Sequence, residues 1–442
     1  MMDNLDSLYN IFLSCGGRVT TDSRKISGGE LFFALKGENF DGNEYALAAL
    51  EAGAAYAVVD KDSTVARENP GNGRLVAVPD TLKALWALAR SHRDLFNIPV
   101  LGLTGTNGKT TTKELINAVL SAKYRTHATS GNLNNNIGVP LTVLGITSET
   151  EIAIVEMGAS HPGDINELVA ICAPDYGLIT NVGKAHILGF GSFEGVKATK
   201  GELYDFIARE RAGKGGIFLN ADNPHLVRMA SDRSLEETGV KIIRYGLEFS
   251  GAQILDSDAE HPFLTLRLSD SSLVRTRLVG SYNADNVLAA LRVGEYFGVP
   301  REAAIAAIEA YTPSNNRSQM QRTSRNVLIV DAYNANPSSM GAALDNFARF
   351  EAEKKIVLLG DMLELGKDSL SEHRNVVETV ARYGFKAYFV GSEFKAAGAP
   401  NCFDSSDALA TYIAANEEDF SGAAILVKGS RGTRMEKTIP AL

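Results

Sequence analysis

The stretch Leu103-Thr104-Gly105-Thr106-Asn107-Gly108-Lys109-Thr110-Thr111-Thr112 decides how the rest of the chain is interpreted. It lies between an apolar segment at 100–103, which predicts a strand, and a helical pattern at 113–123. Glycines let backbone N–H groups surround phosphate oxygens, and the helix N-terminus adds positive charge. Lys109 would reach the β- and γ-phosphates, and the Thr110 hydroxyl would ligate Mg²⁺. The stretch therefore predicts a phosphate-binding loop, although Leu103 stands where the strict pattern has glycine.

The composition is that of a globular protein and excludes several other classes. The 442 residues are 45% hydrophobic and 22% charged, with a net charge of −9 and no basic block, which argues against a nucleic-acid partner. No apolar run approaches the roughly 18 residues of a membrane span, and the acidic N-terminus does not resemble an export signal. Cys15, Cys172 and Cys402 lie far apart, which fits a reducing compartment. We therefore expect a cytoplasmic protein with no membrane insertion.

The alternation of apolar and helical segments predicts an α/β fold in three domains. The three domains are expected to span residues 1–97, 98–312 and 313–442. Linker-like or polar segments interrupt the pattern where one domain ends and the next begins. In the first domain, Thr81 can cap a helix that runs to about residue 96. Strands are expected in the first domain at 31–35 and 56–59, and in the central domain at 100–103, 152–156, 176–180 and 216–219. In the third domain they are expected at 327–331, 356–361, 387–391 and 424–428. The central domain has the pattern of a mostly parallel sheet.

Two residues at predicted strand ends are candidates for metal binding. Glu156 closes the apolar segment 152–156, where a nucleotide-binding sheet places an acid that holds Mg²⁺. A lone strand-end carboxylate is usually only a solvated charge, and the phosphate loop upstream favours the metal-binding interpretation. His186 lies in a glycine-rich loop, and a histidine there, like His161, is usually a surface or hydrogen-bonded residue.

Lys200 is unusual because of its position on a predicted helix. If 194–209 is helical, Val196, Lys200, Leu203 and Ile207 share one stripe, which places a lysine on an apolar, inward face. Lysine is rarely buried without a partner. The amine could extend to the edge of the helix, form an ion pair, contact a ligand or be modified.

The third domain places polar residues directly at the ends of its predicted strands. Asp331, Asp361, Gly391 and Lys428 all fall at carboxyl ends, and ligands bind at that edge of an open α/β sheet. The segments 331–337, 361–364 and 428–434 are therefore expected to converge on one crevice. No GxGxxG motif accompanies them, which argues against a dinucleotide cofactor.

These motifs, in this order, resemble those of the ATP-dependent Mur ligases over nearly the whole chain. The matching segments are Gly105–Thr110, Glu156–Ala159, Ala185-His186, Lys200–Glu202, Tyr282–Asn286 and Asn316-Arg317. Three more segments, 331–337, 359–366 and 427–432, are similar to the member of the family that adds D-alanyl-D-alanine to UDP-N-acetylmuramoyl tripeptide in peptidoglycan synthesis. The resemblance implies a small N-terminal UDP-binding domain, a central P-loop ATPase-like domain, a C-terminal Rossmann-like domain and a monomer.

The resemblance also implies a reaction. ATP would phosphorylate the terminal carboxylate of the tripeptide, and the amine of D-alanyl-D-alanine would attack the acyl phosphate through a tetrahedral intermediate. Lys109 would serve the phosphates, while Thr110 and Glu156 would hold one Mg²⁺. His186 would hold a second Mg²⁺ with Glu156, assisted by Lys200 as a carbamate.

The remaining site residues follow from the same resemblance. Asn286 would contact adenine, although Tyr282 stands where the family often has histidine, and Arg317 and Asp331 would complete the nucleotide site. The UDP-sugar and peptide contacts would come from Ser23, Arg24, Asp41, Gly42, Asn134, Asn135, Asn136, Asn334, Asn336, Asp361, Lys428, Ser430 and Arg431.

Three other functions compete with this interpretation. A sister ligase that adds another amino acid, or glutamate to folates, would share the ATP machinery. A phosphate-loop switch would hydrolyse nucleotide to drive a partner, but it has no need of Lys200, His186 or the segment 428–431. A non-catalytic scaffold would not need the phosphate-loop lysine and threonine.

Overall fold

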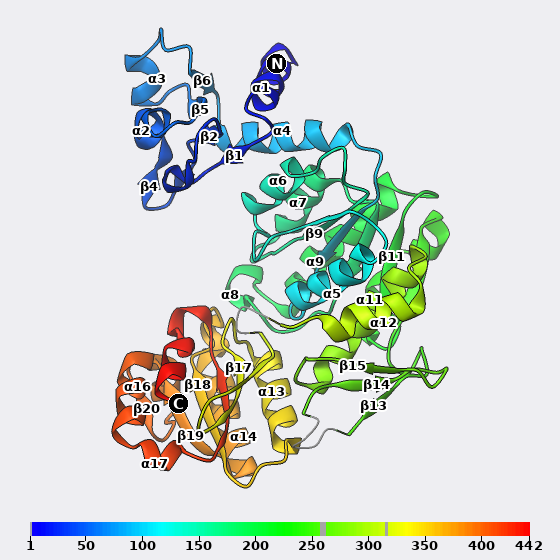
Figure 1. Cartoon of the computed structure of the whole chain (residues 1–442), viewed down its shortest axis with the longest axis vertical. Coiled ribbons are helices and arrows are strands. Elements are labelled where there is room, and N and C mark those ends of the chain that lie inside the picture. Colours follow the sequence, from blue (N-terminus) through cyan, green and yellow to red (C-terminus); the bar gives the residue numbers. More distant parts are fainter. Residues whose placement is uncertain (1, 257–261, 314–316) are drawn as a thin grey trace. The chain divides into compact units, whose positions relative to one another are not determined.

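The computed structural model describes residues 2–256, 262–313 and 317–442 (Figure 1), so Asn316 of the Asn316-Arg317 motif lies outside the described residues. The chain forms two compact units. The first comprises residues 1–103, 124–158 and 164–177, and the second comprises residues 104–123, 159–163 and 178–442. The predicted domain boundaries after residues 97 and 312 stay predictions.

The first unit begins with a small parallel sheet. Its strands, in the order β1-β2-β5-β6, are β1 (Val19–Thr20), β2 (Leu31–Phe33), β5 (Tyr56–Asp60) and β6 (Leu75–Val78). Helix α2 (Ala46–Glu51) packs Ala46 and Ala49 against Phe32 and Val59 in one apolar cluster. The predicted strands at 31–35 and 56–59 are confirmed, whereas β1 and β6 were not expected.

Helix α4 (Thr81–Asp94) carries the chain from this sheet to the next. The prediction that Thr81 caps it was wrong: Asp80 accepts from the Lys83 amide, and the Thr81 hydroxyl donates to Ala34 O at 3.2 Å. At the other end of α4 the buried Arg93 side chain donates to Cys172 O at 3.1 Å and to the Asp175 carboxylate at 2.8 Å. This guanidinium fastens the helix to residues far along the sequence.

The central sheet has six strands in the order β12-β11-β10-β7-β9-β8. They are β7 (Val100–Thr104), β8 (Thr126–Ala128), β9 (Ile152–Glu156), β10 (Tyr176–Ile179), β11 (Gly216–Asn220) and β12 (Lys241–Tyr245). Strand β7 pairs in parallel with β9, β8 with β9, and β11 with β12. The four predicted strands of this domain are therefore confirmed, and their long apolar runs reflect burial of both faces.

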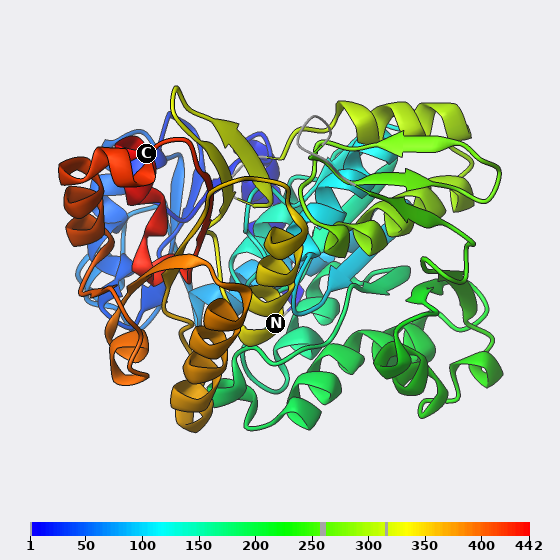
Figure 2. The same cartoon turned by 90° about the horizontal axis from the view of Figure 1, so that it is seen from below.

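A three-stranded antiparallel sheet in the second unit was not expected from the sequence. It consists of β13 (Gln253–Leu255), β14 (Thr265–Arg267) and β15 (Leu273–Arg275). Helix α12 (Arg301–Ala310) packs against β15 (Figure 2). Each strand has only three residues, which is too short for a period-two pattern to stand out.

The second unit ends in a six-stranded sheet in the order β16-β17-β21-β18-β19-β20. The strands are β16 (Gln319–Arg322), β17 (Val327–Asp331), β18 (Lys355–Gly360), β19 (Lys386–Val390), β20 (Cys402–Phe403) and β21 (Ala424–Lys428). All pairs are parallel except β16 with β17. Helices α13 (Pro337–Arg349) and α14 (Ser369–Tyr383) cover one face, and α16 (Ser406–Ala415) covers the other (Figure 1).

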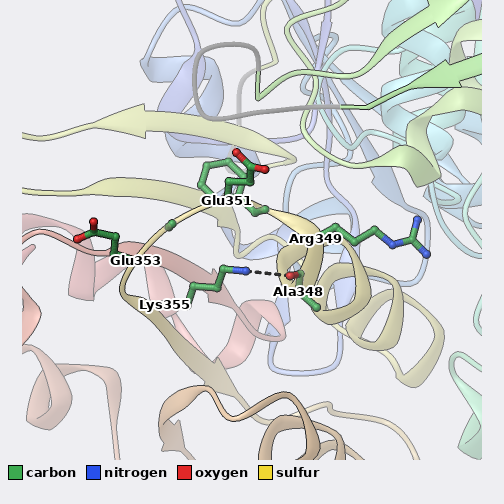
Figure 3. Close-up of a pocket in the computed structure, with 7 residues that line it drawn as sticks. Ala348, Arg349, Glu351, Glu353 and Lys355 are labelled. Carbon is green, nitrogen blue, oxygen red and sulfur yellow. Dashed lines mark hydrogen bonds between the residues drawn. The ribbon is translucent and has the colours of Figure 1, made fainter.

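A surface pocket lies at the C-terminal end of α13. It is lined by residues 348–353 and Lys355, whose ammonium donates to Ala348 O at 2.8 Å (Figure 3). A lysine at this position satisfies a carbonyl that the helix leaves without an internal partner. None of the predicted site residues lines this pocket.

Within 2–256, 262–313 and 317–442, no helix is both long and apolar enough to cross a bilayer.

The contacts of Arg93 at the end of α4 give a prediction about stability. Replacing Arg93 by Met removes a buried cation and leaves carbonyls and the Asp175 carboxylate without its hydrogen bonds. We expect the free energy of unfolding to fall by about 2–3 kcal/mol. Urea denaturation of the full chain measures it, with Lys83→Met as control, because Lys83 is an exposed residue on the same helix. Equal stability of the two variants would contradict the role of Arg93.

Candidate functional site

The phosphate loop forms as predicted between β7 and helix α5 (Lys109–Ser121). Gly108 precedes the helix with φ +77°, and a side chain on Gly105 would collide with Thr180. Both glycines are therefore required by the path of the backbone. The Lys109 ammonium donates to Gly105 O at 2.8 Å and to Thr106 O at 3.2 Å, which folds it over the loop.

The side chains of two asparagines outside the loop, Asn181 and Asn286, form hydrogen bonds that support it. The Thr106 and Asn107 amides donate to Asn181 O at 3.0 Å and to Asn181 Oδ1 at 2.9 Å. Thr112, in the first turn of α5, donates to Asn286 Oδ1 at 2.9 Å, and a side chain on Gly108 would meet that same amide. Asn286 thus supports the loop, and its contact with adenine stays a prediction.

Thr110 and Thr111 both lie buried in the first turn of α5. Because the first four N–H groups of a helix have no partner inside the helix, this turn offers donors as well as the positive end of the dipole. The arrangement suits an anion such as a nucleotide phosphate.

In the first unit, Glu156 lies at the carboxyl end of β9 and is fully buried. Its backbone is in register with Leu103 of β7, the residue from which the phosphate-loop stretch begins. Asn134 donates to Glu156 Oε1 at 2.8 Å. Asn135 instead accepts from the Gly138 amide at 2.8 Å, and Asn136 accepts from the Trp86 indole through its backbone oxygen at 2.7 Å.

His186 and Lys200 lie near one another in the second unit. His186 precedes the short helix α8 (Ile187–Phe190) with φ +50°, and its ring lies edge-on to Phe190 at 6.3 Å. Lys200, on α9 (Phe193–Glu210), is only 3% exposed, and its Nζ lies 5.8 Å from the Phe190 ring centre. The inward position of Lys200 is confirmed, and extension of its amine to solvent is excluded.

The charge of Lys109 also acts on the imidazole of His186. Burial lowers the pKa of His186, Glu364 opposes that shift, and the charges of Lys109 and Lys200 lower the pKa further. The sequence did not single out Glu364 as a site residue, yet its carboxylate pairs with His186 Nδ1.

The C-terminal strand ends converge, as the sequence predicted. Lys428, at the end of β21 and 1% exposed, pairs with Asp331 at the end of β17 over 2.5 Å. It also donates to Asn334 O at 3.2 Å. Asp331 in turn accepts from the Ser318 amide at 3.3 Å. This ion pair organises the loop that follows β17.

Three predicted substrate residues form hydrogen bonds to other parts of the protein. Asp361 accepts from the Glu393 and Phe394 amides at the start of α15 (Ser392–Ala396), and burial raises the pKa of its carboxyl group. Asn336 caps α13 and donates to Asn107 of the phosphate loop at 2.7 Å. Ser430 accepts from the Leu363 amide and donates to Ala335 O. The structure gives each a positioning role, and their substrate contacts stay predictions.

Two predicted arginines stack on one tyrosine. The guanidinium carbons of Arg317 and Arg431 lie 3.5 Å and 5.3 Å from the centre of the Tyr333 ring. Such stacking holds a planar cation in place without neutralising it. Tyr333 lies within the predicted 331–337 segment, but nothing in the sequence marked it as the support of both arginines.

The predicted UDP-binding segments are capped turns. Asp22 caps a turn that begins at Ser23 by accepting from the Arg24 amide. It also accepts two hydrogen bonds from the Arg24 guanidinium, and these lower the pKa of Asp22 to about 2. Asp41 caps the next turn by accepting from the Asn43 amide at 2.9 Å. Gly42 packs so tightly on the Leu35 backbone that no side chain fits there.

In the ranges 2–256, 262–313 and 317–442, no three His, Cys, Asp or Glu side chains stand close enough to hold a metal ion. A divalent ion here would need further ligands from nucleotide phosphates, water or a hydroxyl such as that of Thr110.

Comparisons with known proteins agree along the whole chain. The Mur ligase family catalytic domain matches residues 18–93, the Mur ligase middle domain matches 103–294, and the Mur ligase glutamate ligase domain matches 316–431. UDP-N-acetylmuramoyl-tripeptide–D-alanyl-D-alanine ligase of Bacillus subtilis is 33% identical, with 96% of this chain and 92% of the relative covered.

Two solved structures are similar over nearly the whole chain. MurF from Acinetobacter baumannii has a TM-score of 0.82 at 29% identity, covering 96% of this chain and 92% of its own. MurF ligase from Thermotoga maritima in complex with ADP has a TM-score of 0.80 at 26% identity, covering 96% of each chain. With the domain matches, these similarities establish that the chain belongs to the Mur ligase family.

Proposed function

We propose that this protein is the ATP-dependent ligase that joins D-alanyl-D-alanine to UDP-N-acetylmuramoyl tripeptide in peptidoglycan synthesis. The observation that carries the proposal is full-length similarity to relatives of that name, at 33% and 32% identity, on a chain whose phosphate loop is intact. Folylpolyglutamate synthase of Mycobacterium tuberculosis is only 17% identical, so that likeness concerns the fold alone. The dipeptide-adding activity is therefore favoured over the sister reactions.

ATP is the energy source, since a related MurF structure holds ADP and this chain has the matching loop. Lys109 and the first turn of α5 would bind the β- and γ-phosphates and stabilise charge on the transferring phosphoryl group. The acceptor is the terminal carboxylate of the tripeptide, which takes the γ-phosphoryl group of ATP to become an acyl phosphate while ADP leaves. The dipeptide nitrogen then attacks the acyl carbon, and phosphate leaves as the tetrahedral intermediate collapses.

We propose that the protein binds Mg²⁺ through hard oxygen ligands. The Thr110 hydroxyl at the phosphate loop and the Glu156 carboxylate at the end of β9 would supply them, and Asn134 donates a hydrogen bond to that carboxylate. Bound Mg²⁺ would neutralise charge on the phosphates. We further propose that His186 and a carbamate on Lys200 serve a second ion, because the amine of Lys200 is buried beside the aromatic ring that His186 also contacts.

The substrates also suggest where and how the protein works. ATP and nucleotide-linked sugars are cytoplasmic metabolites, so we expect the reaction to take place in the cytoplasm. We also expect a monomer, as the resemblance to the family implies.

Phosphate release tests the proposed reaction directly. ATP and Mg²⁺ are supplied with UDP-N-acetylmuramoyl tripeptide and D-alanyl-D-alanine, singly and together. We expect release to require both substrates, with one phosphate per pentapeptide formed. Release with neither substrate would support a nucleotide switch, and release only with another amino acid would identify a sister ligase.

The phosphate loop gives a second prediction. Lys109→Ala removes the cation that faces the transferring phosphate, so kcat is expected to fall by about 1,000-fold. Thermal unfolding should change little, since the Lys109 ammonium donates to carbonyls of its own loop. Lys123→Ala, just beyond the end of the same helix, is the control and should keep kcat. Full activity in Lys109→Ala would refute the assignment of the loop.

The proposed carbamate gives a third prediction. Lys200→Ala should lose activity by about 100-fold, and acetate or propionate should restore part of it by placing a carboxylate in the vacated space. Lys197→Ala is the matched control, because Lys197 pairs with Glu194 on the same helix. No rescue, together with a native enzyme that is indifferent to CO₂ removal, would count against the carbamate.

A further inference from the structure

The loop that follows β18 is held at three successive backbone amides by three different elements. The Asp361 amide donates to a carbonyl oxygen of β19 at 3.0 Å, and the Leu363 amide donates to Ser430 Oγ at 3.0 Å. The amide between them, that of Met362, donates to Nε2 of His373 on α14 at 3.0 Å. At the middle of this loop, an imidazole therefore holds the backbone.

The imidazole of His373 is completely buried, and both of its nitrogens form hydrogen bonds. Because a backbone amide only donates and a carbonyl only accepts, Nε2 accepts from Met362, and Nδ1–H donates to Ser369 O at 2.7 Å. The ring also lies edge-on to Phe394, with 4.6 Å between the ring centres. His373 is thus fixed on three sides, and its ring cannot turn without loss of buried hydrogen bonds.

The same loop is joined to the segment that follows β21. The Ser430 amide donates to Asp361 O at 3.1 Å, so Ser430 binds the residues on both sides of Met362. A side chain on Gly432 would meet Leu363 Cδ1 at 2.8 Å, so the two segments also pack closely. A shift of Met362 would therefore move Asp361 and Ser430, which are two of the predicted substrate residues.

We propose that His373 is a positioning residue that fixes the loop 361–363 at the carboxyl edge of the C-terminal sheet for the binding of the dipeptide. This inference rests on the proposed function for the identity of the substrate, but not for the contact itself. Ligands bind at the carboxyl edge of an open α/β sheet, and a loop that is fixed beforehand loses less conformational freedom when its ligand binds. The phosphate loop and the predicted UDP-binding turns belong to other sheets, which leaves the dipeptide for this edge.

Substitutions of His373 can separate its two hydrogen bonds. The side-chain amide of glutamine can stand where Nε2 stands, and that of asparagine can stand where Nδ1 stands. His373→Gln therefore keeps an acceptor for the Met362 amide, whereas His373→Asn keeps only the bond to Ser369 O. His373→Phe loses both bonds but keeps a ring against Phe394, so it replaces the asparagine variant if that variant does not fold.

Hydrogen exchange of the full-length protein without substrates, followed by mass spectrometry, measures the contact itself. We expect the Met362 amide to exchange about 10-fold faster in His373→Asn and His373→Phe than in the native protein. In His373→Gln it should exchange at nearly the native rate. Equal exchange at Met362 in all of these proteins would overturn the proposal, as would an unprotected Met362 amide in the native protein.

Steady-state kinetics connects the contact to the substrate. In His373→Asn the KM for D-alanyl-D-alanine should rise about 10-fold, with the KM for ATP unchanged, and His373→Gln should restore the native value. A residue that only stabilised the fold would leave both KM values unchanged. An unchanged KM for the dipeptide in a variant whose Met362 amide exchanges faster would therefore overturn the positioning role. The expected exchange pattern in a native protein that releases no phosphate with both substrates would uphold the contact and refute the proposed function instead.

Discussion

A phosphate loop must keep its backbone amides in place, although Gly105 and Gly108 contribute no side chains that could hold them. Much of the site depends on the residues outside the loop that hold its backbone instead. Thr180 and Asn181 fix one side of the loop through its backbone, while Asn286 supports the start of α5 through Thr112. The glycines are necessary because these supports occupy the space that their side chains would fill. Rigidity of the loop thus comes in large part from residues outside the loop.

The C-terminal sheet uses its polar strand ends in a similar way. Lys428 and Asp331 neutralise one another at the ends of two adjacent strands, and Asp361 satisfies the first amides of α15. A buried charge without a partner costs several kcal/mol, so such pairs are maintained wherever the fold places charge at this edge. Asn336 then extends the network by capping α13 and donating to Asn107. The carboxyl edge of the C-terminal sheet is therefore held by hydrogen bonds and an ion pair within the protein itself.

The sequence predicted the main strands well because buried parallel strands are continuous apolar runs that end in polar turns. Residues 152–156 and 327–331 were placed without error, and the inward face of Lys200 followed from helical spacing. The strands β13 to β15 were missed, since three residues are too few for a pattern. Long-range partners were also missed: neither the pairing of Glu364 with His186 nor the stacking of two arginines on Tyr333 leaves a trace in local spacing.

The cations of the second unit share one feature that bears on catalysis. Lys109 donates to loop carbonyls, Arg317 and Arg431 stack on an aromatic face, and Lys428 pairs with the Asp331 carboxylate. An aromatic ring holds a cation in position without cancelling its charge, unlike a carboxylate. An incoming phosphate or carboxylate would therefore meet stacked guanidinium groups that are already oriented and need little reorganisation. Such preorganisation is the largest contribution that a protein makes to phosphoryl and acyl transfer, where negative charge spreads over oxygens in the transition state.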